Sequence, residues 1–172
     1  MRRPKRVAPP ERAVGPRRNA AEVAGERPSS IRRKGLRGGH ARLARAAARA
    51  RRRAYAPYSR FPVGAAALTA DGMIYTGCNV ENASYGLTLC AERVAIHTAV
   101  ADGHRRVMAI AVAGPAGGTL MPCGACRQVM AEFGVQTVIL ASARGAPAIV
   151  SLPDLLPRPF TRSSVRLRHA GL

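Results

Sequence analysis

The chain has 172 residues, of which 47% are hydrophobic, and it contains no Trp. This length fits one ordinary domain, and no apolar run approaches the ~20 residues that span a bilayer. The formal net charge of +19 is typical of a nucleic-acid-binding protein, but 18 of the 28 Lys and Arg residues lie within residues 1–53, where the net charge is +15. Residues 54–172 carry only +4, so the charge belongs to a leader and not to a domain.

The leader differs in composition from the rest of the chain. Residues 1–38 combine Arg, Pro, Gly and Ser with almost no large apolar side chains, which predicts disorder. We expect a catalytic domain at 39–160 and a short tail at 161–172. The N-terminal charges precede no apolar stretch, so a secretory signal is not expected. Four cysteines are too few for a disulfide scaffold, and thiols that must stay free suit a reducing compartment. We therefore expect a cytoplasmic protein.

Apolar periodicity and turn residues predict the elements of the domain. In chain order they are a helix at His40–Ala54, strands at Val63–Thr69 and Met73–Val80, a helix at Cys90–Ala101, a strand at Val107–Ala113, a helix at Cys123–Phe133, strands at Val135–Ala141 and Ala146–Val150, and a short helix at Leu152–Leu156. The Asp71-Gly72 pair predicts a tight hairpin between the first two strands. This order indicates an α/β fold with a single mixed β-sheet of about five strands, covered by helices.

Three cysteines and one glutamate carry the chemistry. Cys90 opens one predicted helix, whereas Cys123 and Cys126 lie in the first turn of another. Helix starts direct unpaired N–H groups and a positive dipole end outward, which favours thiolates. Two such starts that meet could hold Zn²⁺ with three sulfurs and leave the fourth position open for water, as in catalytic zinc sites. Glu92 could then reach that water without binding the metal.

Other interpretations of these cysteines are possible. A lone Cys-x-x-Cys pair is often a redox pair or half of a structural zinc ribbon. A ribbon requires a fourth ligand, and Cys78 is the only other cysteine; it lies in a predicted strand, where a small buried thiol is the expected role. No histidine stands at ligand spacing from the three cysteines. The pattern matches the one described for zinc nucleobase deaminases.

Four ordered blocks extend this match. They are YAPYSRFPVGAA at 55–66, GCNVENASY at 77–85, LCAER at 89–93 and PCGACRQ at 122–128. Together they resemble the homotetrameric zinc-dependent cytidine deaminases, and the resemblance covers roughly residues 40–160. It implies a cytidine deaminase that hydrolyses cytidine and deoxycytidine to uridine and deoxyuridine in pyrimidine salvage, with one Zn²⁺ per subunit in a homotetramer.

The resemblance also implies a role for individual residues. Cys90, Cys123 and Cys126 are the implied zinc ligands. Glu92 is the implied proton shuttle, which takes a proton from water, passes one to N3 of the base and helps ammonia to leave. The implied substrate-binding residues are Phe61, Asn79, Glu81, Ala91 and Phe160. Asn79 and Glu81 are expected on one strand face, where they would bind the ribose.

Three of the implied roles concern the surroundings of the substrate and the metal. Phe61 is expected to pack against the pyrimidine, and Phe160 to enter the site of a neighbouring subunit. Arg93 and Gln128 are expected to hydrogen-bond around the ligand sulfurs. Three thiolates on Zn²⁺ leave a formal charge of −1, which a guanidinium would offset.

Two alternative functions remain open at this point. The enzyme could act on another aminated pyrimidine such as blasticidin S, although Asn79 and Glu81 favour a ribonucleoside. A nucleic-acid-binding protein with a structural zinc and a basic arm is the alternative from another class. The domain itself lacks a basic surface studded with aromatics, and Glu92 would have no task there. Any nucleic-acid binding is therefore expected to be weak, non-specific and confined to the leader.

Overall fold

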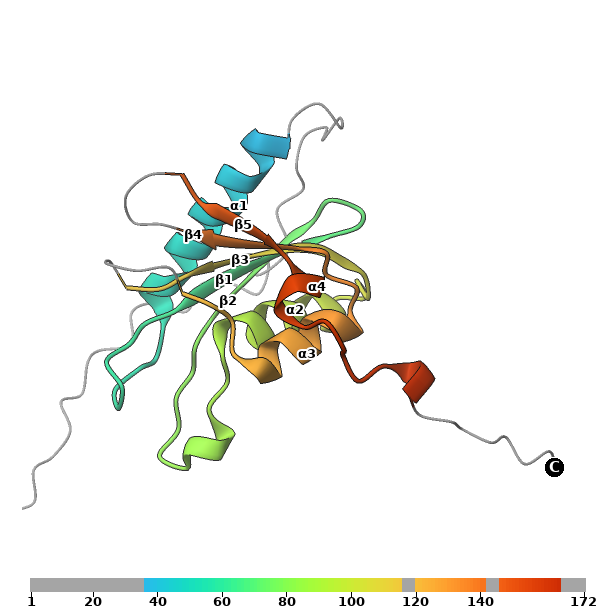
Figure 1. Cartoon of the computed structure of the whole chain (residues 1–172). Helices are drawn as coiled ribbons and strands as arrows, with labels where there is room; N and C mark the ends of the chain where they lie inside the picture. Colours follow the sequence, from blue (N-terminus) through green and yellow to red (C-terminus); the bar gives the residue numbers. More distant parts are fainter. Residues whose placement is uncertain (1–35, 116–119, 142–145, 165–172) are drawn as a thin grey trace, which may run out of the picture.

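The computed structural model describes residues 36–115, 120–141 and 146–164, with side chains described from residue 39 onward. These residues form a five-stranded sheet in the order β2-β1-β3-β4-β5, with helices against it (Figure 1). The predicted α/β fold with one mixed sheet is confirmed. No helix in the described ranges combines the length and hydrophobicity needed to cross a membrane.

The sheet contains both strand orientations. Its strands are β1 (Gly64–Thr69), β2 (Ile74–Cys78), β3 (Val107–Ala113), β4 (Thr137–Ala141) and β5 (Ala148–Ser151). Strand β1 pairs antiparallel with both β2 and β3, β3 pairs parallel with β4, and β5 returns antiparallel to β4. The β1–β2 connection is the predicted hairpin, in which Gly72 has a φ of 92° that favours glycine.

Helices cover both faces of the sheet. Helix α1 (Leu36–Ala50) packs on one face, whereas α2 (Ala91–Ala101) and α3 (Gly124–Glu132) pack on the other; α4 (Leu152–Leu155) contacts α3 and β5 (Figure 1). An apolar core lies on each face of the sheet, and successive residues of β1 point into them alternately. Ala65 and Ala67 face α2 and α3, while Ala66 faces α1. Because helices cover both faces of the sheet at β1 and β4, these two strands are apolar except for a terminal Thr and do not alternate with polar residues.

Helix α1 begins earlier than its composition predicts. It starts at Leu36, not near His40, so the last three residues of the predicted leader are helical. Gly38 and Gly39 are poor helix formers, but the packing of the Leu43 turn against the sheet outweighs their low helix propensity. A short 3₁₀ turn, η2 (Arg51–Arg53), follows α1. Residues 1–35 and 165–172, and with them most of the predicted leader and tail, lie outside the described residues.

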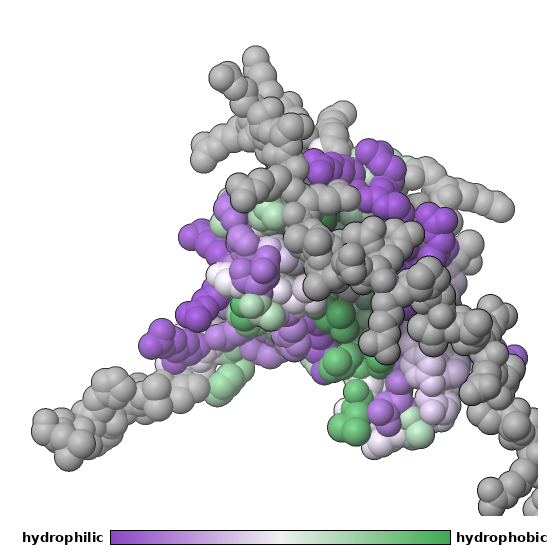
Figure 2. All heavy atoms as spheres, turned by 180° about the vertical axis from the view of Figure 1, so that it is seen from behind, coloured by the Kyte–Doolittle hydropathy of each residue, from purple (hydrophilic) through white to green (hydrophobic). Residues whose placement is uncertain are grey.

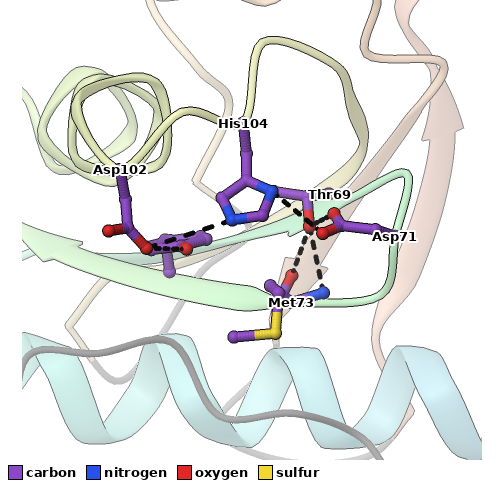
Figure 3. A network of polar contacts seen from close by, with 6 residues as sticks. Thr69, Asp71, Met73, Asp102 and His104 are labelled. Atoms are coloured by element: carbon purple, nitrogen blue, oxygen red, sulfur yellow. Dashed lines mark hydrogen bonds and ion pairs between the residues drawn. The ribbon is translucent and has the colours of Figure 1, made fainter.

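A polar network joins the β1–β2 hairpin to the C-terminal end of α2 (Figure 3). The Nδ1 atom of His104 lies 3.0 Å from the Asp71 carboxylate, and its Nε2 atom lies 3.9 Å from that of Asp102. Thr69 donates to Asp71 at 2.6 Å, and the Tyr75 hydroxyl donates to Asp102. Burial, and then the bond to Asp102, raise the pKa of Tyr75 to about 12, so the phenol stays a donor. The network fixes the end of α2 that lies away from the helix start.

Strand β2 and helix α2 are in unusually close contact at Gly77. A Cβ atom on Gly77 would lie 2.4 Å from the Ala95 nitrogen and 2.5 Å from the Ala91 oxygen, and both are backbone atoms. A backbone cannot move aside as the end of a flexible side chain can. Glycine is therefore required here by the approach of the helix.

We predict that Gly77→Ala destabilises the fold by about 2 kcal/mol or more, because overpacking of a rigid core typically costs ~1–3 kcal/mol. Urea unfolding followed by circular dichroism measures the change. Gly39→Ala is the matched control, since nothing lies within 4 Å of a Cβ at Gly39. Equal stability of the two variants would contradict the close contact.

Candidate metal centre and active site

Two helix starts hold the three cysteines. Cys90 is the N-cap of α2 and Cys123 is the N-cap of α3, each one residue before the helix, where the sequence placed them inside it. Neither thiol makes a capping hydrogen bond, so both sulfurs are free to point away from their helices. Cys126, in the first turn of α3, is fully buried. The packing of α2 against α3 brings the two starts together.

The three sulfurs form one cluster. Their Sγ atoms all lie within 4.8 Å of one another, and those of Cys90 and Cys123 are 4.0 Å apart. Tetrahedral zinc with Zn–S bonds of ~2.3 Å places its sulfurs about 3.8 Å apart, so this spacing suits one ion. No fourth Cys, His, Asp or Glu joins the group within the described part of the chain. Three thiols without a fourth protein ligand are the donor set of an open zinc site.

The thiols differ in acidity. Hydrogen bonding from Cys126, and further bonds from Arg93 and Cys123, lower the pKa of Cys90 to about 5 although burial opposes the shift. The pKa of Cys126 is raised, because it donates to Cys90 and is buried. The cluster therefore holds a thiolate at Cys90 at neutral pH, and a bound metal ion would favour deprotonation of all three.

Arg93 lies beside this thiolate. Its Nη2 group donates to the Thr88 carbonyl at 2.8 Å and contacts the Cys90 sulfur at 3.8 Å. The guanidinium thus reaches one of the sulfurs that the sequence associated with it. Its positive charge offsets the excess negative charge of a three-thiolate zinc centre.

Glu92 is a carboxylate in an apolar setting. Only 5% of the residue is exposed, and it follows Cys90 by two positions at the start of α2. Burial raises the pKa of Glu92, and the negative charge of Cys90 adds to this effect. A buried carboxyl group that takes up a proton more readily than usual thus lies two residues from Cys90 of the sulfur cluster. Ala91, between them, is completely buried.

Asn79 and Glu81 differ from the predicted arrangement. Strand β2 ends at Cys78, so the two residues lie beyond it and not on one strand face. Asn79 is buried; its Oδ1 accepts from the Val63 nitrogen at 2.8 Å and its Nδ2 donates to the Phe61 carbonyl at 3.0 Å. These two bonds connect the chain beyond β2 to the segment that carries Phe61.

Glu81 binds the same segment a few residues earlier. Its carboxylate accepts from the Tyr58 nitrogen at 2.9 Å, from the Ser59 nitrogen at 3.2 Å and from the Ser59 hydroxyl. The Ser59 hydroxyl also accepts from the Phe61 nitrogen at 3.0 Å. Hydrogen bonds from Ser59 and Tyr58 lower the pKa of Glu81. Arg60, between Ser59 and Phe61, has a left-handed φ of 55°, so this network holds a sharp turn in place.

Two aromatic residues expected at the site are exposed. Phe61 is 44% exposed and Phe160 is 64% exposed. Gln128, which the sequence associated with the ligand sulfurs, instead pairs with the backbone of Phe160: it donates to the Phe160 oxygen and accepts from its nitrogen at 3.1 Å. The backbone of Phe160 offers both an acceptor for the NH₂ group of Gln128 and a donor for its oxygen, whereas a thiolate can only accept.

Sequence reasoning missed two polar residues of this region. Ser59 bridges Glu81 and Phe61, and its position two residues before Phe61 is typical of a local Ser turn. Arg127 donates to two backbone carbonyls, one of them that of Pro122, and only its place beside Cys126 hinted at a role.

The chain is similar to known proteins in sequence and in fold. A model of the cytidine and deoxycytidylate deaminase zinc-binding region matches residues 38–142. The chain is 49% identical to a cytidine deaminase of Sporosarcina psychrophila, covering 68% of this chain and 88% of the relative. It is 50% identical to one of Halalkalibacterium halodurans, covering 69% and 92%. A crystal structure of cytidine deaminase from Burkholderia pseudomallei, 53% identical, covers 70% of this chain and 98% of its own, with a TM-score of 0.67. The chain therefore belongs to the zinc-binding family of cytidine and deoxycytidylate deaminases.

Proposed function

We propose that the chain is a zinc-dependent cytidine deaminase that hydrolyses cytidine and deoxycytidine to uridine and deoxyuridine with release of ammonia. The observation that carries the proposal is the cluster of three thiols beside the buried carboxylate of Glu92. Family membership supports it, as do relatives named cytidine deaminase that are half identical over most of their length. The reaction is the deamination step of pyrimidine salvage.

The ligands and the shuttle have distinct tasks in the mechanism. Cys90, Cys123 and Cys126 would hold Zn²⁺, which supplies a Lewis acid that makes water nucleophilic at neutral pH. Glu92 takes one proton from the attacking water and delivers it to N3 of the pyrimidine, then takes the second from the resulting C4 hydroxyl and delivers it to the amine, which leaves as ammonia as the C4 carbonyl forms. A carboxyl group whose pKa is raised by burial suits both halves of this exchange. Arg93 limits the negative charge at the sulfurs.

The substrate is proposed to lie against the segment that Asn79 and Glu81 hold. Phe61 would pack against the pyrimidine face, and Ala91 would line the base next to Glu92. Glu81 keeps acceptor capacity for a ribose hydroxyl beyond its bonds to Tyr58 and Ser59. The amide of Asn79 already binds Phe61 and Val63 through its oxygen and its nitrogen, so it contributes to ribose binding mainly by placing this segment.

Assembly is proposed to complete the site. Large apolar side chains are exposed around the loop 79–90, among them Tyr85 at 75% and Leu87 at 66%. Figure 2 shows hydrophobic side chains from the middle to the lower end of the molecule, the end at which this loop lies in Figure 1. We propose a homotetramer that buries this loop and takes Phe160 into a neighbouring subunit's site.

The remaining segments are proposed to lie outside the chemistry. The catalytic domain is assigned to 39–160 and a short tail to 161–172. The basic leader, 1–38, is proposed to be disordered up to the start of α1 at Leu36. Any binding of nucleic acid by the leader is proposed to be weak and without sequence preference. A cytoplasmic location suits free thiols that must bind metal.

An assay of the purified protein tests the proposed activity. Cytidine, deoxycytidine, cytosine and blasticidin S are offered separately, and ammonia release and loss of the 4-amino chromophore are followed. We expect turnover of the two nucleosides and little of free cytosine, because ribose contacts contribute to binding. Turnover of blasticidin S alone would replace the proposed substrate by an aminopyrimidine antibiotic.

Metal content tests the ligand assignment. We predict one Zn²⁺ per wild-type chain and its loss from Cys123→Ala, because two thiolates hold zinc poorly against water and buffer. Cys78→Ala is the control and should keep its zinc, since the Cys78 thiol only donates to the Arg53 carbonyl. Elemental analysis of protein purified without added metal decides; bound iron, or full zinc in Cys123→Ala, would overturn the assignment.

Glu92→Gln should keep the fold and the zinc but lose ~10²–10⁴-fold in kcat, the usual contribution of a general acid–base group. Glutamine keeps the shape of the side chain and cannot exchange the proton. Glu132→Gln, an exposed change at the end of α3, is the matched control and should leave kcat unchanged. Activity of Glu92→Gln within tenfold of wild type would remove Glu92 from the mechanism.

Light scattering tests the assembly. We expect the mass of a tetramer for the wild type and smaller species for Leu87→Glu, because a charge would be buried in the proposed interface. Ile149→Glu changes a side chain that is 53% exposed on β5 and should leave the mass unaltered. A wild-type monomer with full activity would refute the tetramer and the role of Phe160 together.

A further inference from the structure

The proposed mechanism assigns no task to Arg127. It follows Cys126 directly in α3, and its side chain is partly buried. The Nε group donates to the Pro122 carbonyl at 2.8 Å, and Nη1 donates to the Leu155 carbonyl at 2.9 Å. No carboxylate pairs with it in the ion pairs of the described residues. A guanidinium placed on two carbonyls serves to fix backbone, not to neutralise an acid.

The first carbonyl belongs to the residue before a proposed ligand. Pro122 is fully buried and has no N–H, so its carbonyl is the only backbone group through which it can hydrogen-bond. The peptide that joins Pro122 to Cys123 is planar, so fixing this carbonyl also fixes the nitrogen and Cα of Cys123. Cys123 itself is exposed and makes no capping bond. Arg127 is therefore the side chain that, among the described hydrogen bonds, fixes the backbone leading into Cys123.

The second carbonyl lies at the end of α4. Leu155 is the last residue of that short helix, where carbonyls lack intrahelical partners. The next residue of α3, Gln128, binds the backbone of Phe160. Two adjacent side chains of the ligand-bearing helix thus hold the segment 155–160, and through Arg127 this segment braces the turn at Cys123.

We propose that Arg127 is a positioning residue of the metal centre, which holds the Pro122–Cys123 peptide so that the Cys123 sulfur stays with those of Cys90 and Cys126 and retains Zn²⁺. The inference rests on the assignment of Cys123 as a ligand, not on the identity of the substrate. Arginine suits this task because its planar fork reaches two carbonyls at once, whereas lysine presents one flexible ammonium.

Zinc release measures this role without reference to deamination. Zinc-loaded wild type, Arg127→Lys, Arg127→Met and the control Arg105→Met are mixed with excess 4-(2-pyridylazo)resorcinol, and the coloured zinc complex is followed over time. Arg105 is an exposed arginine that follows the C-terminal end of α2. Circular dichroism and thermal unfolding of the same samples record whether each variant is folded.

We expect Arg127→Met to release zinc about 10–100-fold faster than wild type, the range seen when partners of metal ligands are lost. Arg127→Lys should release it at an intermediate rate, and Arg105→Met at the wild-type rate. Release from Arg127→Met at the wild-type rate with a lowered unfolding temperature would show a purely structural role and overturn the proposal. If Arg127→Met does not fold, Arg127→Lys decides: wild-type release from it also overturns the proposal.

The outcome is separable from the proposed activity. A protein that fails to deaminate cytidine but shows this order of release rates would keep Arg127 as a positioning residue and lose only the substrate. A protein that deaminates cytidine while all four samples release zinc equally would keep the activity and lose the inference.

Discussion

The contact between β2 and α2 at Gly77 sets the position of the whole site. Strand and helix backbones approach there until no methyl group fits between them, so the helix can begin at only one place relative to the sheet. That start carries Cys90 and Glu92. Helix α3 packs on α2 and adds its own two thiols, and a shared apolar core holds both helices on the sheet. The positions of Cys90 and Glu92 thus depend on a backbone contact in which neither side chain takes part.

Local patterns in the sequence predicted most of the fold. Asp71-Gly72 indicated the hairpin because its turn needs only neighbouring residues, and the order of apolar runs indicated the mixed sheet. The ends of helices were less accurate where local signals compete with packing. Helix α1 begins earlier than the Ala- and Arg-rich composition predicted, because it packs on the sheet. Helices α2 and α3 each begin one residue later than predicted, because a cysteine occupies the N-cap.

The candidate site, like the fold, was predicted from the sequence only where the signal is local. The thiol cluster followed from spacing within two short motifs, because each motif places its cysteines at one helix start. The hydrogen-bond partners did not follow, since they lie far apart in the chain: Gln128 and Phe160 are separated by 32 residues, Arg127 and Leu155 by 28, and Ser59 and Glu81 by 22. No periodicity connects such pairs, and only the folded chain shows that Gln128 binds backbone and not sulfur.

The small size of the core side chains has a consequence for the entropy of folding. Alanine supplies much of the apolar surface between the sheet and its helices, including Ala65, Ala66 and Ala67 along β1. An alanine methyl has no rotamers to lose on burial, whereas Leu and Ile lose ~0.5–1 kcal/mol each. The scaffold therefore gains little hydrophobic free energy per residue but also gives up little side-chain freedom.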